Sequence, residues 1–490
     1  MRLFLDWFTL TIQRHPAPLR SVLRVMDKVA PAALRRRALA NARAVHAVFE
    51  RPEDFLMGIG NAPKLKLGPF LLGMDPGPQY DREKRLLTQA LARPLEVFPA
   101  IAAHESRRYA ERMASELHAG KRLNLIAEFV EPVYVRAIAH CFGVPVQNCS
   151  SEWLDTKPGD RTLALFIRTL GATIGSSHPA PFGLEELAEQ VAGEFAVYLR
   201  DAISLHRSGA IARQLERHAD GSPLLAASDT VLGRLLREQA RTGSESFSDG
   251  DWGIVRSLGG LLSASAGFPK AFAHALHELL RRLDRPELQK LAAAARRGDK
   301  RCVDAYVLEA LRFRPVYPML TRYCPRSTAL PELHAKAGTQ LAIFPLAAMF
   351  DPVHVERPEQ FLPGRPAGSY SVFGHGPRAC LGEALMMALF TPMLGALFEH
   401  APQLLEVEAG EFRYDGAALE RYELRLPGQP GDELCAGESA PAARPSARQA
   451  PPLAAAEPSS DARESTGELA ALFYPAARAP ELPLRTEPPR

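Results

Sequence analysis

The chain has 490 residues, 46% of them hydrophobic and 23% charged, which is typical of a globular protein with a large core. Its net charge of +3 gives no support for a nucleic-acid partner, and a solvated helix face explains the dense basic run at residues 35–37. The six cysteines form no CxxC pair, which argues against a zinc ribbon and favours reduced thiols in the cytoplasm.

Residues 1–40 are predicted to form a helical lead-in to the fold. Their apolar beginning is interrupted by Asp6 and followed by Arg14, whereas a membrane span needs about 20 nearly uninterrupted apolar residues. The segment also lacks the small-residue cleavage site of a signal peptide. We therefore expect an amphipathic first helix and no transmembrane segment.

Helical periodicity of the apolar residues dominates the chain up to about residue 428. The segments with the helical pattern are residues 102–117, 126–142, 184–205, 229–242 and 252–283. Short β patterns occur at residues 339–344 and 421–426. The prediction is a mainly α fold with a small β region, formed by residues 41–428.

The composition changes after Pro427 to Ala, Pro, Arg, Glu and Ser, with few large apolar side chains. Such a segment cannot bury enough surface to offset the entropy lost on ordering. Residues 429–490 are therefore predicted to be a disordered tail.

A cysteine among glycines marks the candidate site. Cys380 lies in the segment Phe-Gly-His-Gly-Pro-Arg-Ala-Cys-Leu-Gly, residues 373–382, and an apolar helical segment follows it. The glycines allow the backbone to pass close to a flat ligand, and the helix N-terminus is expected to lower the thiol pKa. Arg378 can offer paired donors to a carboxylate. A thiolate is a strong axial ligand for haem iron.

Other roles for this cysteine are weaker. A zinc site needs three further ligands, and only His375 is close in sequence. A nucleophilic cysteine needs a base and a group that orients the base, which sequence spacing alone does not exclude. A structural cysteine leaves the neighbouring phenylalanine, glycines and arginine unexplained.

The segment resembles the signature of the cytochrome P450 family, Phe-x-x-Gly-x-Arg-x-Cys-x-Gly. Phe373, Gly376, Arg378, Cys380 and Gly382 match every fixed position. The resemblance, which covers roughly residues 40–428, implies a single haem-thiolate domain with the cytochrome P450 fold. It implies haem b as cofactor, Cys380 as the iron ligand and the four other residues as cofactor contacts.

Further residues fit this resemblance. Glu309 and Arg312 form a Glu-x-x-Arg pattern, which in the family is a buried structural pair behind the haem. Arg322 stands where such proteins place an arginine that binds a haem propionate. Tyr80 and Lys84 stand where the family commonly has a histidine and an arginine that reach the propionates, and both can donate hydrogen bonds.

The predicted long helix, residues 252–283, departs from the family. Members that activate dioxygen usually carry an acid and an alcohol there as a proton relay, and Pro269 and Lys270 replace them. The proline is expected to kink the helix. Small residues before it indicate either space for an apolar pocket or a close helix–helix contact; they are Gly259, Gly260, Ser263, Ala264, Ser265, Ala266 and Gly267.

The resemblance implies an oxidoreductase, with a monooxygenase that oxidises a lipophilic molecule as the leading hypothesis. A ferredoxin-type partner would supply the electrons, and residues 58–70 and 171–183 would supply substrate contacts. Pro269 and Lys270 keep open a peroxide-dependent peroxygenase or hydroperoxide isomerase, with Lys270 binding a substrate carboxylate. A haem-binding sensor without turnover is the remaining alternative.

Overall fold

The computed structural model describes Pro16 and residues 38–424, with gaps at residues 58–66, 69, 119–122, 146–162, 176–183, 214, 216–223, 246, 248, 331–332, 401–411 and 416–417. These residues lie in one compact unit, Arg2–Gln429. The predicted tail and nearly all of the predicted lead-in lie outside the described residues. Within the described part, no helix is long and apolar enough to cross a membrane.

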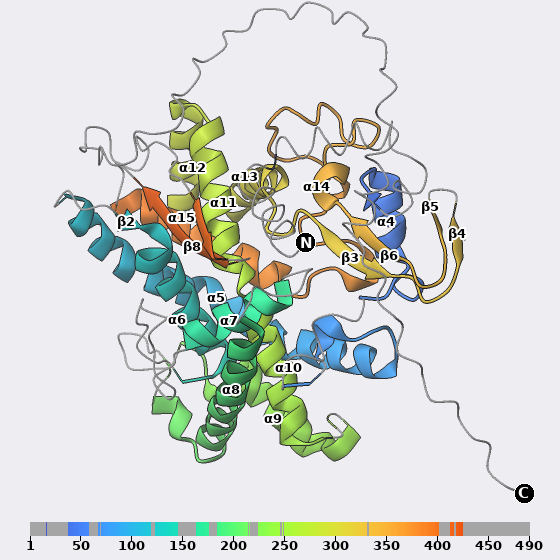
Figure 1. Ribbon diagram of the computed structural model, residues 1–490. Helices are drawn as coiled ribbons and strands as arrows, with labels where there is room; N and C mark the ends of the chain where they lie inside the picture. Colours follow the sequence, from blue (N-terminus) through green and yellow to red (C-terminus); the bar gives the residue numbers. More distant parts are fainter. Residues whose placement is uncertain are drawn as a thin grey trace, which may run out of the picture. The chain divides into compact units, whose positions relative to one another are not determined.

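Helices make up most of the described chain, which confirms the mainly α prediction (Figure 1). They are α4 (Ala42–Glu50), α5 (Pro78–His118), α6 (Glu131–Phe142), α7 (Leu163–Gly175), α8 (Leu184–Arg207), α9 (Val231–Thr242), α10 (Asp251–Ala264), α11 (Gly267–Arg282), α12 (Arg285–Arg296), α13 (Lys300–Phe313), α14 (Pro345–Ala348) and α15 (Glu383–His400).

Three small sheets complete the fold of the described residues. The first has the order β1-β6-β3, with β1 parallel and β3 antiparallel to β6, and the second has the antiparallel order β2-β8-β7. The third is the β4-β5 hairpin. The strands are β1 (Ala38–Leu39), β2 (Leu123–Asn124), β3 (Leu320–Tyr323), β4 (Thr328–Leu330), β5 (Leu333–Ala335), β6 (Gln340–Ile343), β7 (Phe412–Asp415) and β8 (Ala418–Leu424).

Polar side chains begin several helices, because the first backbone N–H groups of a helix have no partner within it. Asn41 accepts from the amide of Ala44 at the start of α4, and Asp299 accepts from the amide of Cys302 at the start of α13. At the other end of a helix, Gly143 ends α6 with a φ of 72°, a left-handed conformation that glycine adopts readily.

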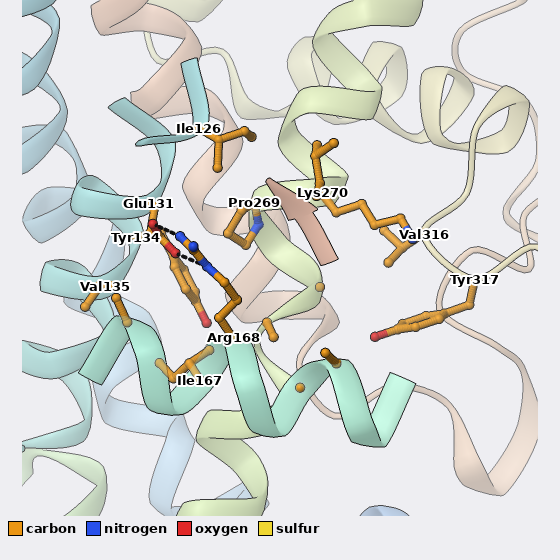
Figure 2. A pocket seen from close by; sticks show the side chains of 16 residues that line it. Ile126, Glu131, Tyr134, Val135, Ile167, Arg168, Pro269, Lys270, Val316 and Tyr317 are labelled. Atoms are coloured by element: carbon orange, nitrogen blue, oxygen red, sulfur yellow. Dashed lines mark hydrogen bonds and ion pairs between the residues drawn. The ribbon is translucent and has the colours of Figure 1, made fainter. Parts of the chain in front are cut away.

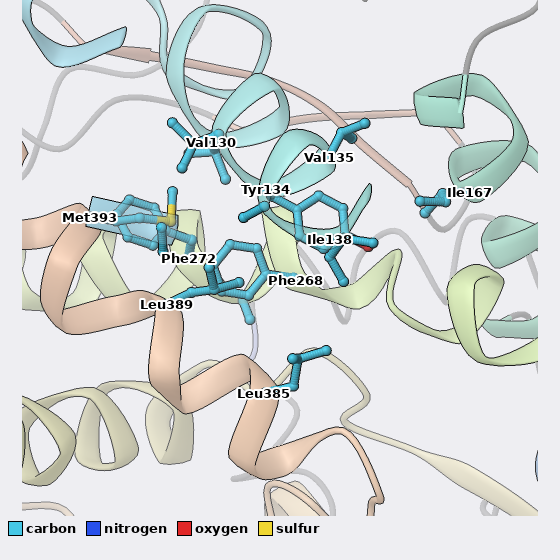
Figure 3. Packing of buried hydrophobic residues seen from close by; sticks show 14 of the residues in the cluster. Val130, Tyr134, Val135, Ile138, Ile167, Phe268, Phe272, Leu385, Leu389 and Met393 are labelled. Atoms are coloured by element: carbon cyan, nitrogen blue, oxygen red, sulfur yellow. The ribbon is translucent and has the colours of Figure 1, made fainter. Parts of the chain in front are cut away.

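An aromatic cluster joins α11 to α15, the helix that follows the cysteine segment (Figure 3). The rings of Phe272 and Phe390 are stacked with centroids 5.5 Å apart, and Phe268 contacts both. Tyr134 of α6 stacks on Phe268 at 5.3 Å. All four side chains are buried, so packing fixes the beginning of α11 relative to α6 and α15.

The predicted helix at residues 252–283 is wrong in one respect, because it is two helices. α10 ends at Ala264 and α11 begins at Gly267. Pro269 therefore lies in the first turn of α11, where an N–H has no intrahelical partner to lose. In a continuous helix the carbonyl of Ser265 would accept from the N–H of residue 269, which proline lacks, and here it accepts from the amide of Phe268. The break thus removes most of the cost of about 3 kcal/mol that proline imposes inside a helix.

The predicted helix at residues 102–117 is only the last part of α5, which begins at Pro78 and continues through Pro94 and Pro99. Proline is unfavourable inside a helix, so the sequence pattern gives no sign of the continuation. Leu91 and Phe98 of α5 are buried in the main core. Tertiary packing therefore outweighs the local penalty.

Candidate haem-thiolate site

The Cys380 segment is a tight loop before α15. The amide of Cys380 donates to the carbonyl of Phe373 at 2.8 Å. Gly374 and Gly376 have φ angles of 73° and 70°, which favour glycine. A Cβ at Gly376 would lie 2.9 Å from the carbonyl oxygen of Phe49, so a side chain there would displace the loop.

Cys380 is an exposed residue and forms no disulfide with another described cysteine, although protein atoms surround much of its sulfur. Burial of the sulfur by surrounding atoms raises its pKa, and backbone N–H groups of Gly382 and Glu383 oppose this shift. The expected net lowering by the helix N-terminus is therefore wrong for the protein alone, because desolvation of the thiolate outweighs the amides. Thiolate formation would need a further positive charge, such as a metal ion.

Arg378 of this loop lies near a second arginine, Arg322. Arg322 of β3 is buried, and burial together with the charge of Arg378 lowers its pKa to about 10. Arg378 donates to the carbonyl of Leu72 at 3.2 Å, while its Nη1 is buried without a hydrogen-bond partner. Within the described ranges, no carboxylate forms a salt bridge with either arginine. Two nearby cations with an unused buried donor are suited to an anionic group of a ligand.

Tyr80 and Lys84, one turn apart on α5, contact the same loop. The Tyr80 hydroxyl donates to the carbonyl of Pro377 at 3.5 Å, and Lys84 donates to that carbonyl as well. The Arg378 guanidinium lies over the Tyr80 ring, 4.8 Å from its centroid. The structure thus brings both predicted residues to the loop, and Tyr80 also to Arg378.

The Glu309–Arg312 pair of α13 is fully buried, with a distance of 2.8 Å between Arg312 Nη2 and Glu309 Oε1. Sequence patterns do not predict three other partners of Glu309, of which the first is the amide of Leu362, which donates to it at 2.9 Å. Arg365 Nε donates to Glu309 at 3.2 Å and the Tyr370 hydroxyl at 3.3 Å. Arg312 also donates to the carbonyl of Met349. This network connects α13 to the chain that leads into the cysteine loop, and no local pattern around Arg365 predicts it.

These residues fit a haem. Cys380 offers a thiol that protein contacts leave accessible, and Arg322 and Arg378 offer cationic donors for propionates. The positive φ angles of the loop allow a flat ligand to approach the backbone. Zinc fits less well, because the described residues contain no group of three His, Cys, Asp or Glu side chains that could hold a metal ion.

A cavity lies between α6, α7 and the beginning of α11 (Figure 2). Pro269 and Lys270 both line it, together with Val316 and Tyr317 from the segment after α13. The sequence patterns gave no sign of its polar wall on α6 and α7. There Arg168 Nε donates to Glu131 Oε1 at 3.1 Å.

Lys270 is only 4% exposed, so its side chain does not extend into bulk water. Its Nζ lies 5.6 Å from the centroid of the Tyr414 ring. Burial lowers the Lys270 pKa to about 7, because the charged ammonium is poorly solvated there. Lys270 therefore titrates near neutral pH on the wall of the cavity.

The small residues before Pro269 have two roles. A Cβ at Gly260 would lie 2.3 Å from the Phe70 ring, and one at Gly259 would lie 3.1 Å from Leu199. These two glycines therefore serve close packing. Ala266 and Gly267 line the cavity, as the pocket interpretation predicts. Of the predicted substrate loops, residues 58–70 and 171–183, only residues 67–68, 70 and 171–175 fall within the described chain.

Comparisons with known proteins agree with this geometry. The family model described as Cytochrome P450 matches residues 295–402, a range that includes the Glu309–Arg312 pair and Cys380. The Cytochrome P450 BJ-1 homolog of Sinorhizobium fredii is 32% identical over 110 residues, which is 22% of this chain and 28% of that relative. The chain therefore spans less than a third of the length of this relative.

Two longer matches extend the similarity. The cytochrome P-450 monooxygenase DoxA of a Streptomyces species is 26% identical over 72% of this chain and 76% of its own length. The crystal structure of P450BioI in complex with an acyl carrier protein ligated to hexadec-9Z-enoic acid superimposes with a TM-score of 0.64. It is 17% identical, and the match covers 85% of this chain and 98% of that one.

Proposed function

Because this chain belongs to the cytochrome P450 superfamily, we propose that it is a haem-thiolate oxidoreductase, a monooxygenase that oxidises a lipophilic small molecule. The observation that carries the proposal is the accessible thiol of Cys380 beside Arg322 and Arg378. Fold alone does not determine chemistry, so the argument depends on this set of side chains.

Each residue of the site has a proposed part in holding haem b. Cys380 would supply the thiolate that holds the iron, and Arg322 and Arg378 would pair with the propionates. Tyr80 and Lys84 hold the loop through Pro377, and Phe373 and Gly382 set its backbone path around the sulfur. Bound there, a thiolate-ligated haem supplies oxidative chemistry with dioxygen or peroxide.

The cavity supports a lipophilic substrate that has an anionic group. Apolar side chains such as Ile126, Ile167 and Val316 form part of its lining. Lys270 is buried on the same wall, where a substrate carboxylate would stabilise its charged form. We propose a ferredoxin-type electron donor for the monooxygenase reaction, and a cytoplasmic location on the basis of the free thiols of Cys141 and Cys324.

Peroxide use is the second candidate, favoured by the side chains at the helix break. Pro269 and Lys270 both line the cavity, where neither supplies the acid or alcohol of the usual relay. A peroxygenase uses peroxide as its oxidant, so it does not need the proton relay that dioxygen activation requires. Under this alternative, Lys270 binds the substrate carboxylate.

One experiment tests both candidates. Purified wild type is supplied with medium-chain carboxylic acids, and product formation is compared between a ferredoxin system with dioxygen and hydrogen peroxide alone. Turnover with the ferredoxin system supports the monooxygenase, and turnover with peroxide alone supports the peroxygenase. Cys380→Ala is the control, and product formation by this variant at the wild-type rate would contradict both proposals.

A further inference from the structure

The hydroxyl side chains near the break between α10 and α11 include Tyr134, Ser265 and Tyr317. Ser265 Oγ contacts both the carbonyl of Leu262 and the Tyr134 hydroxyl. A carbonyl can only accept, so the single proton of Ser265 is donated to Leu262. Tyr134 must then donate its own proton to Ser265. The protons of Tyr134 and Ser265 are therefore both directed away from the cavity.

Tyr317 differs from the other two. Its hydroxyl makes no hydrogen bond to any residue in the described part of the chain, and the residue is 38% exposed and lines the cavity. Figure 2 shows its ring pointing into the cavity from the side opposite Tyr134. The hydroxyl lies 3.6 Å from the place where a Cβ on Gly267 would stand. The phenol therefore reaches the helix break.

The phenol of Tyr317 stays protonated at neutral pH. Desolvation of the phenol by the protein atoms around it raises the pKa of Tyr317 to about 12, and a negative charge on Cys380 would act in the same direction. The phenol consequently keeps its proton at neutral pH and can serve as a neutral donor. Its approach to Gly267 places this donor in the cavity that Pro269 and Lys270 also line.

We propose that Tyr317 would donate a hydrogen bond to small ligands of a haem held by Cys380, in place of the side chains that Pro269 and Lys270 replace. A fixed donor in a cavity acts strongly on a ligand that carries partial negative charge. This inference rests on the proposed haem-thiolate function, and it assigns a donor that the cysteine motif does not reveal.

The test uses the full-length holoprotein, with carbon monoxide on the reduced haem as the probe and infrared spectroscopy of the C–O stretch as the readout. A donor to the carbon monoxide oxygen lowers this frequency. We expect Tyr317→Phe to raise it, and Tyr134→Phe, which removes the same group from the same cavity, to leave it unchanged. Equal C–O frequencies in wild type and Tyr317→Phe would overturn the inference. It would also be overturned if the C–O frequency rose in Lys270→Met but not in Tyr317→Phe.

A second measurement uses wild type alone, so it does not require any variant to fold. Exchange into D2O should shift the C–O band, because the phenolic proton is exchangeable, and an unshifted band would contradict the inference. The visible spectrum separates the two proposals. A wild-type carbon monoxide complex without the red-shifted Soret band of thiolate ligation refutes the proposed function. That band together with an unchanged C–O stretch in Tyr317→Phe refutes only the role of Tyr317.

Discussion

The cysteine loop and the helix break are built in different ways. The loop matches a family signature at every fixed position, and it is held by backbone turns and by the buried network of Glu309. The break between α10 and α11 replaces the family's acid and alcohol with Pro269 and Lys270, and aromatic packing holds it. The comparison associates the family signature with the loop that carries Cys380, and the departure from the family pattern with the cavity beside the helix break.

The largest expected effect tests the cysteine side of this comparison. Glu309→Ala would leave Arg312 and Arg365 buried without their carboxylate, which should lower the free energy of unfolding by about 3–5 kcal/mol. Urea unfolding measures this change. Glu238→Ala is the matched control, because Glu238 and Arg241 have the same spacing but lie at the surface, and it should have little effect. Equal effects would show that the buried network adds no stability.

The next effect concerns the charge of Lys270. Its pKa is about 7 in the folded protein against an ordinary value of 10.5, so between these pH values the unfolded chain binds a proton that the folded chain does not. The stability of wild type should therefore rise with pH from about 7 to about 10.5, by up to about 1.4 kcal/mol per pH unit.

Lys270→Met should lack this rise, so its stability advantage over wild type should be greatest below pH 7 and should shrink as the pH increases. Urea unfolding of both proteins from pH 6 to pH 10 measures the difference. A constant difference across that range would mean that Lys270 is charged and well solvated in the folded protein.

A smaller effect tests ligand selection at the helix break. Lys270→Ala should weaken the binding of dodecanoate by about 1–3 kcal/mol, the range for a lost hydrogen bond to a charged group. Dodecanol, which has the same chain without the charge, should bind wild type and variant alike. Titrations that follow the haem spectrum measure both ligands. Equal losses for the acid and the alcohol would indicate a change in cavity shape.

The smallest expected effect concerns residues 431–490. Their composition has few large apolar side chains, so deleting them should leave the haem spectrum and the thermal midpoint almost unchanged. Differential scanning calorimetry of the truncated chain checks this prediction. A fall of several degrees in the midpoint would show that Leu472, Phe473 or Tyr474 stabilises the folded unit.

Sequence patterns predict the tight backbone turn before α15, since glycines, a proline and a cysteine at fixed spacing determine a loop locally. They do not predict the raised pKa of the Cys380 thiol, which depends on desolvation by the folded chain. Patterns also predict the mainly α fold, because helical periodicity marks the core face of most helices. They do not predict Arg365 or Tyr317, which reach their places through contacts between distant segments. The end of α10 was missed because Ser265 and Ala266 are compatible with a continuous helix, and the break depends on how Pro269 is accommodated.

The visible spectrum of the reduced carbon monoxide complex tests the central claim most directly. Thiolate ligation by Cys380 predicts a strongly red-shifted Soret band in wild type, because the sulfur donates electron density to the iron. Cys380→Ala should lose that band, whereas Cys324→Ala, which changes a buried thiol outside the loop, should retain it. A red-shifted band that persists in Cys380→Ala would contradict the account.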